Sequence, residues 1–99
     1  MNVNFYATLR QIVGQKTVKI TVNLGTTAIQ LVRKLVSIYP LMSNELLDEN
    51  ENFLPHMKYF INGRQSEYLP EKLDTVIQQD DKIDIFPPVG GGQDQAVFS

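Results

Sequence analysis

The chain has 99 residues, with 9 Lys or Arg against 11 Asp or Glu, and it contains no cysteine. This length suits one domain, and a net charge of −2 without a basic cluster argues against a nucleic-acid partner. The lack of cysteine excludes disulfides, thiolate metal sites and a cysteine nucleophile, and is compatible with the reducing cytoplasm, where we expect the protein. The sequence shows no signal peptide and no apolar run of membrane-spanning length, so we expect no membrane partner.

Two alternating segments open the chain. Residues 2–7 place Val3, Phe5 and Ala7 on one face, which predicts a β-strand. Residues 16–23 alternate in the same way and predict a second strand. The short connection between them contains Gly14, and we therefore expect a β-hairpin.

A helix is predicted next. Thr27 and Gln30 form the capping-box pattern, and Pro40 ends the helix at Tyr39. Five apolar residues recur at helical spacing and predict the buried stripe: Ile29, Val32, Leu35, Val36 and Tyr39. Residues 43–47 predict a further short helical turn.

The remaining pattern is again that of strands. Residues 57–61 predict a third strand, Asn62-Gly63 predicts a tight hairpin into a brief return strand, and residues 82–86 predict the last strand. A helix between the second and third strands indicates an α+β fold of the β-grasp (ubiquitin-like) type. We expect a mixed sheet of four to five strands, with one main helix packed on one face, over residues 1–89.

Residues that could carry chemistry inside the domain are few. His56 has no second histidine or cysteine to act with, and Asp80, Asp81 and Asp84 are best explained as turn and edge-strand carboxylates. We therefore expect no metal site and no catalytic centre in the domain. The acidic run at residues 48–52 fits either a docking surface for a basic partner or, the reading we favour, a solvated loop.

The C-terminal segment is the most unusual feature. Pro87-Pro88 ends the last strand, and Gly90-Gly91-Gly92 follows within residues 90–99, which we expect to form a flexible glycine-rich tail. Because glycine has no side chain, such a tail is thin enough to enter a narrow channel in a partner. The composition alone equally fits a plain linker.

Several short motifs resemble one family. They are Val3-Asn4-Phe5-Tyr6-Ala7-Thr8-Leu9-Arg10, Gly25-Thr26-Thr27, Tyr39-Pro40, Asn62-Gly63-Arg64 and Ile85-Phe86-Pro87-Pro88-Val89-Gly90-Gly91-Gly92. Over residues 1–92 the chain resembles the sulfur-carrier proteins of the MoaD/ThiS group, especially the small subunit of molybdopterin synthase and its archaeal modifier relatives. The last motif is highly specific, whereas each of the others alone is weak.

The resemblance implies a reactive C-terminus. In this family the terminal glycine, which matches Gly92, is adenylated by an E1-like enzyme that uses ATP, and is then converted to a thiocarboxylate. In the molybdopterin branch the tail enters the large synthase subunit and gives its sulfur to molybdopterin. In archaeal relatives the activated glycine is joined to lysines of other proteins. By this likeness the chain is a carrier that binds no cofactor, and the residues that enter the partner are Pro87, Pro88, Val89, Gly90 and Gly91.

Three aromatic residues are expected on the open face of the sheet. Tyr6, Phe60 and Phe86 are each out of phase with the apolar residues beside them in their strands. Exposed aromatic patches often mark interfaces, and the family docks its large subunit through this region. The alternative is that these rings lie at the sheet rim beneath loops.

The chain departs from the family after Gly92. Family members usually end at the second glycine, whereas seven residues, 93–99, follow Gly92 here, and the peptide bond leaves Gly92 no carboxylate to adenylate. Three explanations stay open. In the first, a protease removes the segment. In the second, the segment is retained and the chain is a non-covalent binding module with an inert tail. In the third, the segment does not belong to the natural protein. With removal, the chain is either a sulfur carrier for molybdopterin or a modifier attached to lysines through Gly92.

Overall fold

The computed structural model describes residues 1–87; residues 88–99, with the predicted tail, lie outside the described part. The strands are β1 (Asn2–Phe5), β2 (Thr17–Lys19), β3 (Lys58–Ile61), β4 (Arg64–Gln65) and β5 (Lys82–Phe86). The α-helices are α1 (Thr8–Val13), α2 (Ala28–Ile38) and α3 (Ser43–Leu46). Short 3₁₀ turns lie at η1 (Pro40–Met42), η2 (Ser66–Tyr68) and η3 (Lys72–Asp74).

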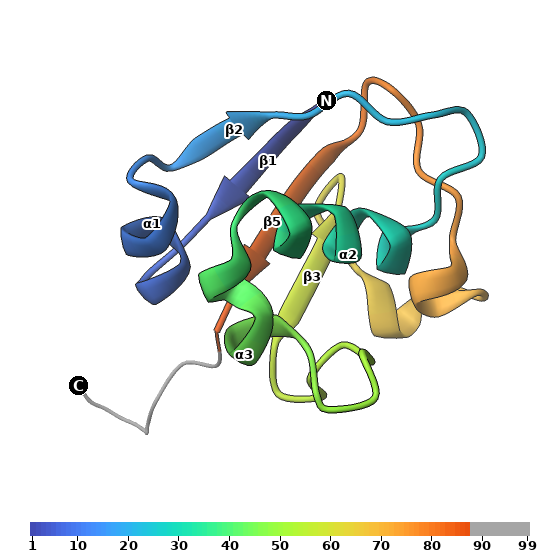
Figure 1. Ribbon diagram of the computed structural model, residues 1–99. Coiled ribbons are helices and arrows are strands. Elements are labelled where there is room, and N and C mark those ends of the chain that lie inside the picture. The colour runs from blue at the N-terminus through green and yellow to red at the C-terminus, as the bar shows by residue number, and fades with distance from the viewer. Residues whose placement is uncertain (88–99) are drawn as a thin grey trace.

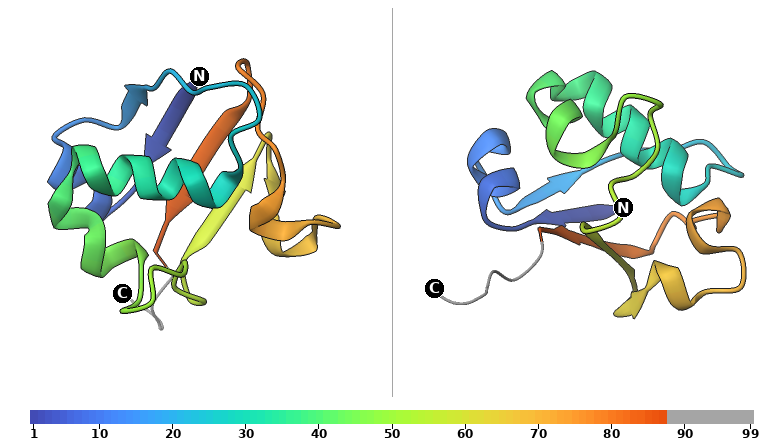
Figure 2. Two further views of the ribbon diagram at one scale, coloured as in Figure 1. Left: turned by 45° about the vertical axis from the view of Figure 1, so that its right-hand side comes forward. Right: turned by 90° about the horizontal axis from the view of Figure 1, so that it is seen from below.

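The five strands form one mixed sheet in the order β2-β1-β5-β3-β4. β1 and β5 run parallel at its centre, and the other neighbours are antiparallel. The helix α2 crosses one face of the sheet, as Figures 1 and 2 show, and the opposite face of the central strands stays open. The predicted α+β β-grasp fold is confirmed. Within residues 1–87, no helix is both long enough and apolar enough to cross a membrane.

The predicted helix is confirmed, with a shift in its buried stripe. The Thr27 hydroxyl accepts from the backbone N–H of Gln30, and the Gln30 side chain accepts from the backbone N–H of Thr27, which completes the capping box. The helix ends at Ile38. The fully buried helix residues are Ala28, Leu31, Val32 and Leu35, whereas Ile29, Val36 and Tyr39 are only half-buried. The buried side of the helix therefore includes Leu31, which the helical spacing of apolar residues did not predict to be buried.

The first connection differs from the prediction. The strand expected over residues 2–7 ends at Phe5, and the helix α1 lies between β1 and β2. Ala7 is exposed rather than buried, because the backbone turns there: the Leu9 N–H donates to the Tyr6 carbonyl at 3.2 Å. A helix of six residues shows too little periodicity to be recognised from the sequence. β2 is also shorter than expected, although Val18, Ile20 and Val22 are buried as the alternation predicted.

Ala7 adopts a backbone conformation that favours glycine. Its φ of 55° and ψ of −128° match the first central position of a type II′ turn, where a Cβ is strained. We expect Ala7→Gly to raise the free energy of unfolding by about 1 kcal/mol, because relief of strain exceeds the added entropy of the unfolded chain. Urea denaturation measures the change. A loss of stability in Ala7→Gly would show that the turn is not strained.

The hairpin at Asn62-Gly63 is confirmed. Both residues have positive φ, 52° and 81°, as a type I′ turn requires. The Asn62 side chain also ties the turn to the start of β5: its Oδ1 accepts from the Lys82 backbone N–H, and its Nδ2 donates to Asp81, each at 2.8 Å. This contact fixes how β3 and β5 begin their antiparallel pairing.

Candidate docking face and strand end

The open face of the sheet is defined by the strand register. Asn4 of β1 pairs with Asp84 of β5, and Asp84 pairs with Phe60 of β3. Residues that are side by side in a sheet project to the same face, and their neighbours Phe5, Ile85 and Tyr59 are buried in the core beneath α2. The register therefore places Asn4, Asp84 and Phe60 on the open face of the sheet, opposite α2. Figure 2 shows that α2 covers only the other face.

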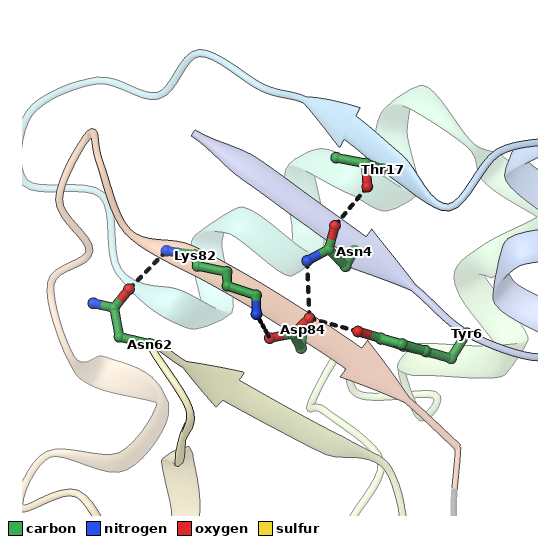
Figure 3. Close-up of polar contacts among 6 residues, drawn as sticks. All are labelled: Asn4, Tyr6, Thr17, Asn62, Lys82 and Asp84. Carbon is green, nitrogen blue, oxygen red and sulfur yellow. Dashed lines mark hydrogen bonds and ion pairs between the residues drawn. The ribbon is translucent and has the colours of Figure 1, made fainter.

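Three aromatic rings gather at one end of this face. The Phe86 ring stacks on the Phe60 ring with centroids 5.1 Å apart, and meets the Tyr6 ring edge-on at 5.2 Å. All three are half-buried, so part of each ring is open to contact. Figure 3 shows Tyr6 reaching across toward β5. The structure thus brings together the three residues that the sequence analysis selected, while their role at a partner interface stays a prediction.

A buried carboxylate lies beside this aromatic cluster of Tyr6, Phe60 and Phe86. Asp84 is 8% exposed, and its Oδ1 accepts from Asn4 Nδ2 at 2.9 Å and from the Tyr6 hydroxyl at 2.8 Å. The Asn4 Oδ1 in turn accepts from the Thr17 hydroxyl at 2.7 Å (Figure 3). Lys82 Nζ lies 3.9 Å from the second carboxylate oxygen. The network ties β2, β1 and β5 together and holds Tyr6 against Phe86.

The electrostatics of the cluster follow from this network. The hydrogen bond to Asp84 is the main cause that raises the pKa of Tyr6, with burial and the carboxylate charge adding to it. Tyr6 therefore stays a neutral donor to Asp84. On its other side, Lys16 Nζ lies 5.3 Å from the centre of the Tyr6 ring, in cation–π contact.

The interpretation of Asp84 as a turn or edge-strand carboxylate is wrong. Asp84 lies in the central strand, whereas Asp81 lies in a turn and accepts from Asn62 and from the Gln78 N–H. The signal available in the sequence was a carboxylate placed between two core residues, Ile83 and Ile85. That signal did not reveal its partners, because Asn4 lies in β1 and Tyr6 directly after it, 78 to 80 positions earlier in the chain.

The other residues considered for chemistry or binding inside the domain do not lie together in one site. His56 is exposed in the turn before β3, and nowhere in residues 1–87 do three His, Asp or Glu side chains gather in a way that could hold a metal ion. The acidic run at residues 48–52 is an exposed turn, closed by Asp48 Oδ1, which accepts from the N–H groups of Asn50 and Asn52. This geometry accounts for Asp48 as a turn residue.

The end of β5 lies beside the aromatic cluster. Phe86 is the last residue of this central strand, and Pro87 follows it directly, half-buried. The other residues predicted to enter a partner lie outside the described residues: Pro88, Val89, Gly90 and Gly91. Gly92, which the sequence analysis predicts to be the reactive residue, also lies outside them. The chain therefore leaves the sheet at its centre, next to Tyr6 and Phe60.

Known proteins resemble the chain over almost its whole length. The chain is 32% identical over 92 residues to small archaeal modifier protein 3 of Haloferax volcanii, covering 93% of this chain and 98% of that protein. It is 30% identical over 88 residues to the molybdopterin synthase sulfur carrier subunit of Dictyostelium discoideum, covering 88% of this chain and 90% of that protein.

Structural and family comparisons agree. The crystal structure of small archaeal modifier protein 1 from Haloferax volcanii has a TM-score of 0.82 at 24% identity, covering 93% of this chain and 98% of that chain, which shows the shared fold. The model of the ThiS family matches residues 3–92. The chain therefore belongs to the ThiS family of small ubiquitin-like sulfur carriers and modifiers.

Proposed function

We propose that this protein is a carrier whose reactive group is the carboxylate of Gly92, formed when a protease hydrolyses the Gly92–Gln93 bond. The observation that carries the proposal is the extent of the family match, which runs through the domain and ends at Gly92. Two features of the fold support it: β5 is a central strand, and its end lies beside three half-buried aromatic rings. A partner that contacts Tyr6, Phe60 and Phe86 would meet the tail as it leaves the sheet.

The proposed chemistry takes place on the tail and in the partner enzymes. Hydrolysis gives a free carboxylate at Gly92 and a free amine at Gln93. In an E1-like enzyme, the Gly92 carboxylate attacks the α-phosphorus of ATP, forming an acyl-adenylate and releasing pyrophosphate. Hydrosulfide then attacks the carbonyl carbon of the acyl-adenylate: a C–S bond forms, the C–O bond to AMP breaks, AMP leaves, and the terminal group becomes a thiocarboxylate. Pro87, Pro88, Val89, Gly90 and Gly91 form the thin segment that reaches into these partners.

The proposed destination of the sulfur is molybdopterin, through the large subunit of molybdopterin synthase. Support comes from the 30% identity to a protein named as the sulfur carrier subunit of that synthase. A second candidate is attachment of Gly92 to lysines of other proteins. The relative named as a small archaeal modifier favours it, at 32% identity over 98% of its length. Both candidates require the same processed and activated glycine.

Intact-mass measurement of the protein purified from its natural source tests the proposal. We expect a chain that ends at Gly92, with part of the population heavier by the difference between sulfur and oxygen. A chain that retains residues 93–99 under all conditions would refute both the sulfur-carrier and the modifier function. Lysine-containing peptides that carry a glycine remnant of this tail would select the modifier function over sulfur transfer.

A further inference from the structure

A cavity lies between the loop before β3 and the turns that follow β4. It has a volume of about 240 Å³ and is lined by residues 53–55, Met57, Tyr59, residues 65–67 and residues 72–73. None of the three residues of the aromatic cluster lines it. The cavity is therefore separate from the candidate docking face and from the end of β5.

The hydroxyl of Tyr59 is the unusual feature of this cavity. Tyr59 is 1% exposed, and its hydroxyl has no hydrogen-bond partner within residues 1–87. Among the fully buried side-chain nitrogen and oxygen atoms of these residues, it is the one that lacks a partner. A buried polar group without a partner destabilises a fold, and such a group in a native protein usually has a specific cause. Contact with a ligand is one such cause.

The protonation state of Tyr59 defines the group that it lacks. Burial raises the pKa of Tyr59, and the charge of Asp81 adds to this effect, so the hydroxyl keeps its proton. A neutral phenol donates one hydrogen bond. The missing partner is therefore a hydrogen-bond acceptor.

The rest of the lining favours an uncharged, mainly apolar ligand. The Phe53 ring meets the Tyr59 ring edge-on with centroids 5.9 Å apart, and Met57 is buried beside them in the lining. The charged residues of the lining, Glu67 and Lys72, are both exposed. An ionised ligand would lose hydration in this cavity without gaining a buried counter-charge, which is unfavourable.

We propose that this cavity binds a small uncharged molecule whose carbonyl oxygen accepts a hydrogen bond from the Tyr59 hydroxyl. The volume lies below the roughly 300 to 1,000 Å³ of sites for drug-sized ligands, so the molecule is smaller than these. Ser66, which is 6% exposed, also lines the cavity and can donate a second bond to the same oxygen. Because the Tyr59 hydroxyl is covered, Met57 shifts to admit the ligand, since its side chain is unbranched and adaptable. The site is independent of the proposed chemistry at Gly92.

Two probes of nearly the same shape test the role of the oxygen. Acetophenone carries a carbonyl group, and α-methylstyrene has a CH₂ group in place of that oxygen. Binding to the full chain is followed by NMR shifts of the backbone amides around the cavity. We expect acetophenone to bind with a Kd of about 1 mM. We expect an affinity about fivefold lower for α-methylstyrene, read from the initial slopes of the titrations, because it leaves the Tyr59 hydroxyl unpaired.

Tyr59→Phe removes the hydroxyl and leaves the ring. We expect this variant to bind acetophenone about fivefold more weakly than the unaltered chain does, and to bind the two probes alike, which completes a double-mutant cycle. Its Tm should rise by about 3 °C, because an unpaired buried group is gone. This rise also shows that the variant is folded.

Tyr68→Phe is the matched control. Tyr68 is 78% exposed and does not line the cavity, so the same atom is removed outside the proposed site. We expect Tyr68→Phe to bind both probes as the unaltered chain does, with an unchanged Tm.

Four results would each overturn the inference. The first is equal affinity of the two probes for the unaltered chain, or no binding of either. The second is an equal loss of acetophenone binding in Tyr59→Phe and Tyr68→Phe. The third is a lower Tm in Tyr59→Phe, which would show that the hydroxyl already has a partner. The fourth is tighter binding of benzoate than of acetophenone, which would show that the site selects a charged ligand.

Discussion

A chain that ends at Gly92 is expected to support pyrophosphate release from ATP by its E1-like enzyme, whereas the chain that continues to Ser99 supports none. The reason is covalent: in the longer chain the Gly92 carbonyl belongs to a peptide bond with Gln93, so no carboxylate exists there to attack ATP. ATP–pyrophosphate exchange measures the step directly. Activity of the two chains at equal rates would show that Gly92 is not the reacting residue.

A set of chains with different last residues tests which residue must carry the reacting carboxylate. Chains that end at Gly91, Gly92 and Gln93 all have a free carboxylate, but the reacting atom moves by one residue each time. We expect only the chain ending at Gly92 to react at the full rate, with a fall of about 100-fold for a misplaced carboxylate. All three chains should unfold at the same urea concentration, because none of residues 1–87 is changed. If the chain that ends at Gly91 were the most active, the reacting carboxylate would be that of Gly91, and the mechanism of adenylation would stay the same.

Asp84→Ala is expected to lower the free energy of unfolding by about 2 to 3 kcal/mol, because the Asn4 amide and the Tyr6 hydroxyl both lose their acceptor. Asp84→Asn keeps an acceptor oxygen at the same place, so we expect it to cost about 1 kcal/mol. Urea denaturation gives both values. A loss in Asp84→Ala no greater than that in Asp84→Asn would show that the hydrogen bonds contribute little to stability.

The titration of Tyr6 gives a second measure of the same network. Its pKa is raised above the ordinary value of 10.0, chiefly because the neutral hydroxyl donates to Asp84. The stabilisation from this bond is therefore complete below the unfolded-state pKa and is lost as the pH rises through the folded-state value. In Asp84→Ala we expect the Tyr6 pKa, followed by NMR of the assigned ring, to fall toward the ordinary value. In Tyr6→Phe, the free energy of unfolding should no longer show the decrease at alkaline pH that the titration of Tyr6 causes.

Loss of Asp84 should also disturb the docking face. The Tyr6 ring is held against Phe86 from one side by the hydrogen bond to Asp84 and from the other by Lys16. Without the bond the ring gains rotamer freedom, and a partner has to order it on binding. We therefore expect one buried carboxylate, Asp84 in β5, to contribute both to the stability of the domain and to the proposed docking.

Local sequence patterns determined most of the elements. The capping box at Thr27, the proline after Tyr39 and the Asn62-Gly63 turn each act over a few residues, so their effects could be read before any packing was known. Alternation also gave the correct face for Tyr6, Phe60 and Phe86, since the period of a strand is fixed at two. The motif that ends at Gly92 located the proposed reactive position, and the structure does not describe it.

Only the tertiary structure decided which distant residues meet. The parallel pairing of β1 with β5 brings Asp84 to Asn4 and Tyr6, and no local pattern encodes a contact across 78 to 80 positions. The turn at Ala7 likewise depends on how α1 fits between β1 and β2 and overrides the alternation at its end. Sequence periodicity thus determined which side of each strand is apolar, while burial of the whole core decided strand order. That order places a buried carboxylate and three aromatic rings on one face, beside the end of β5 at Phe86.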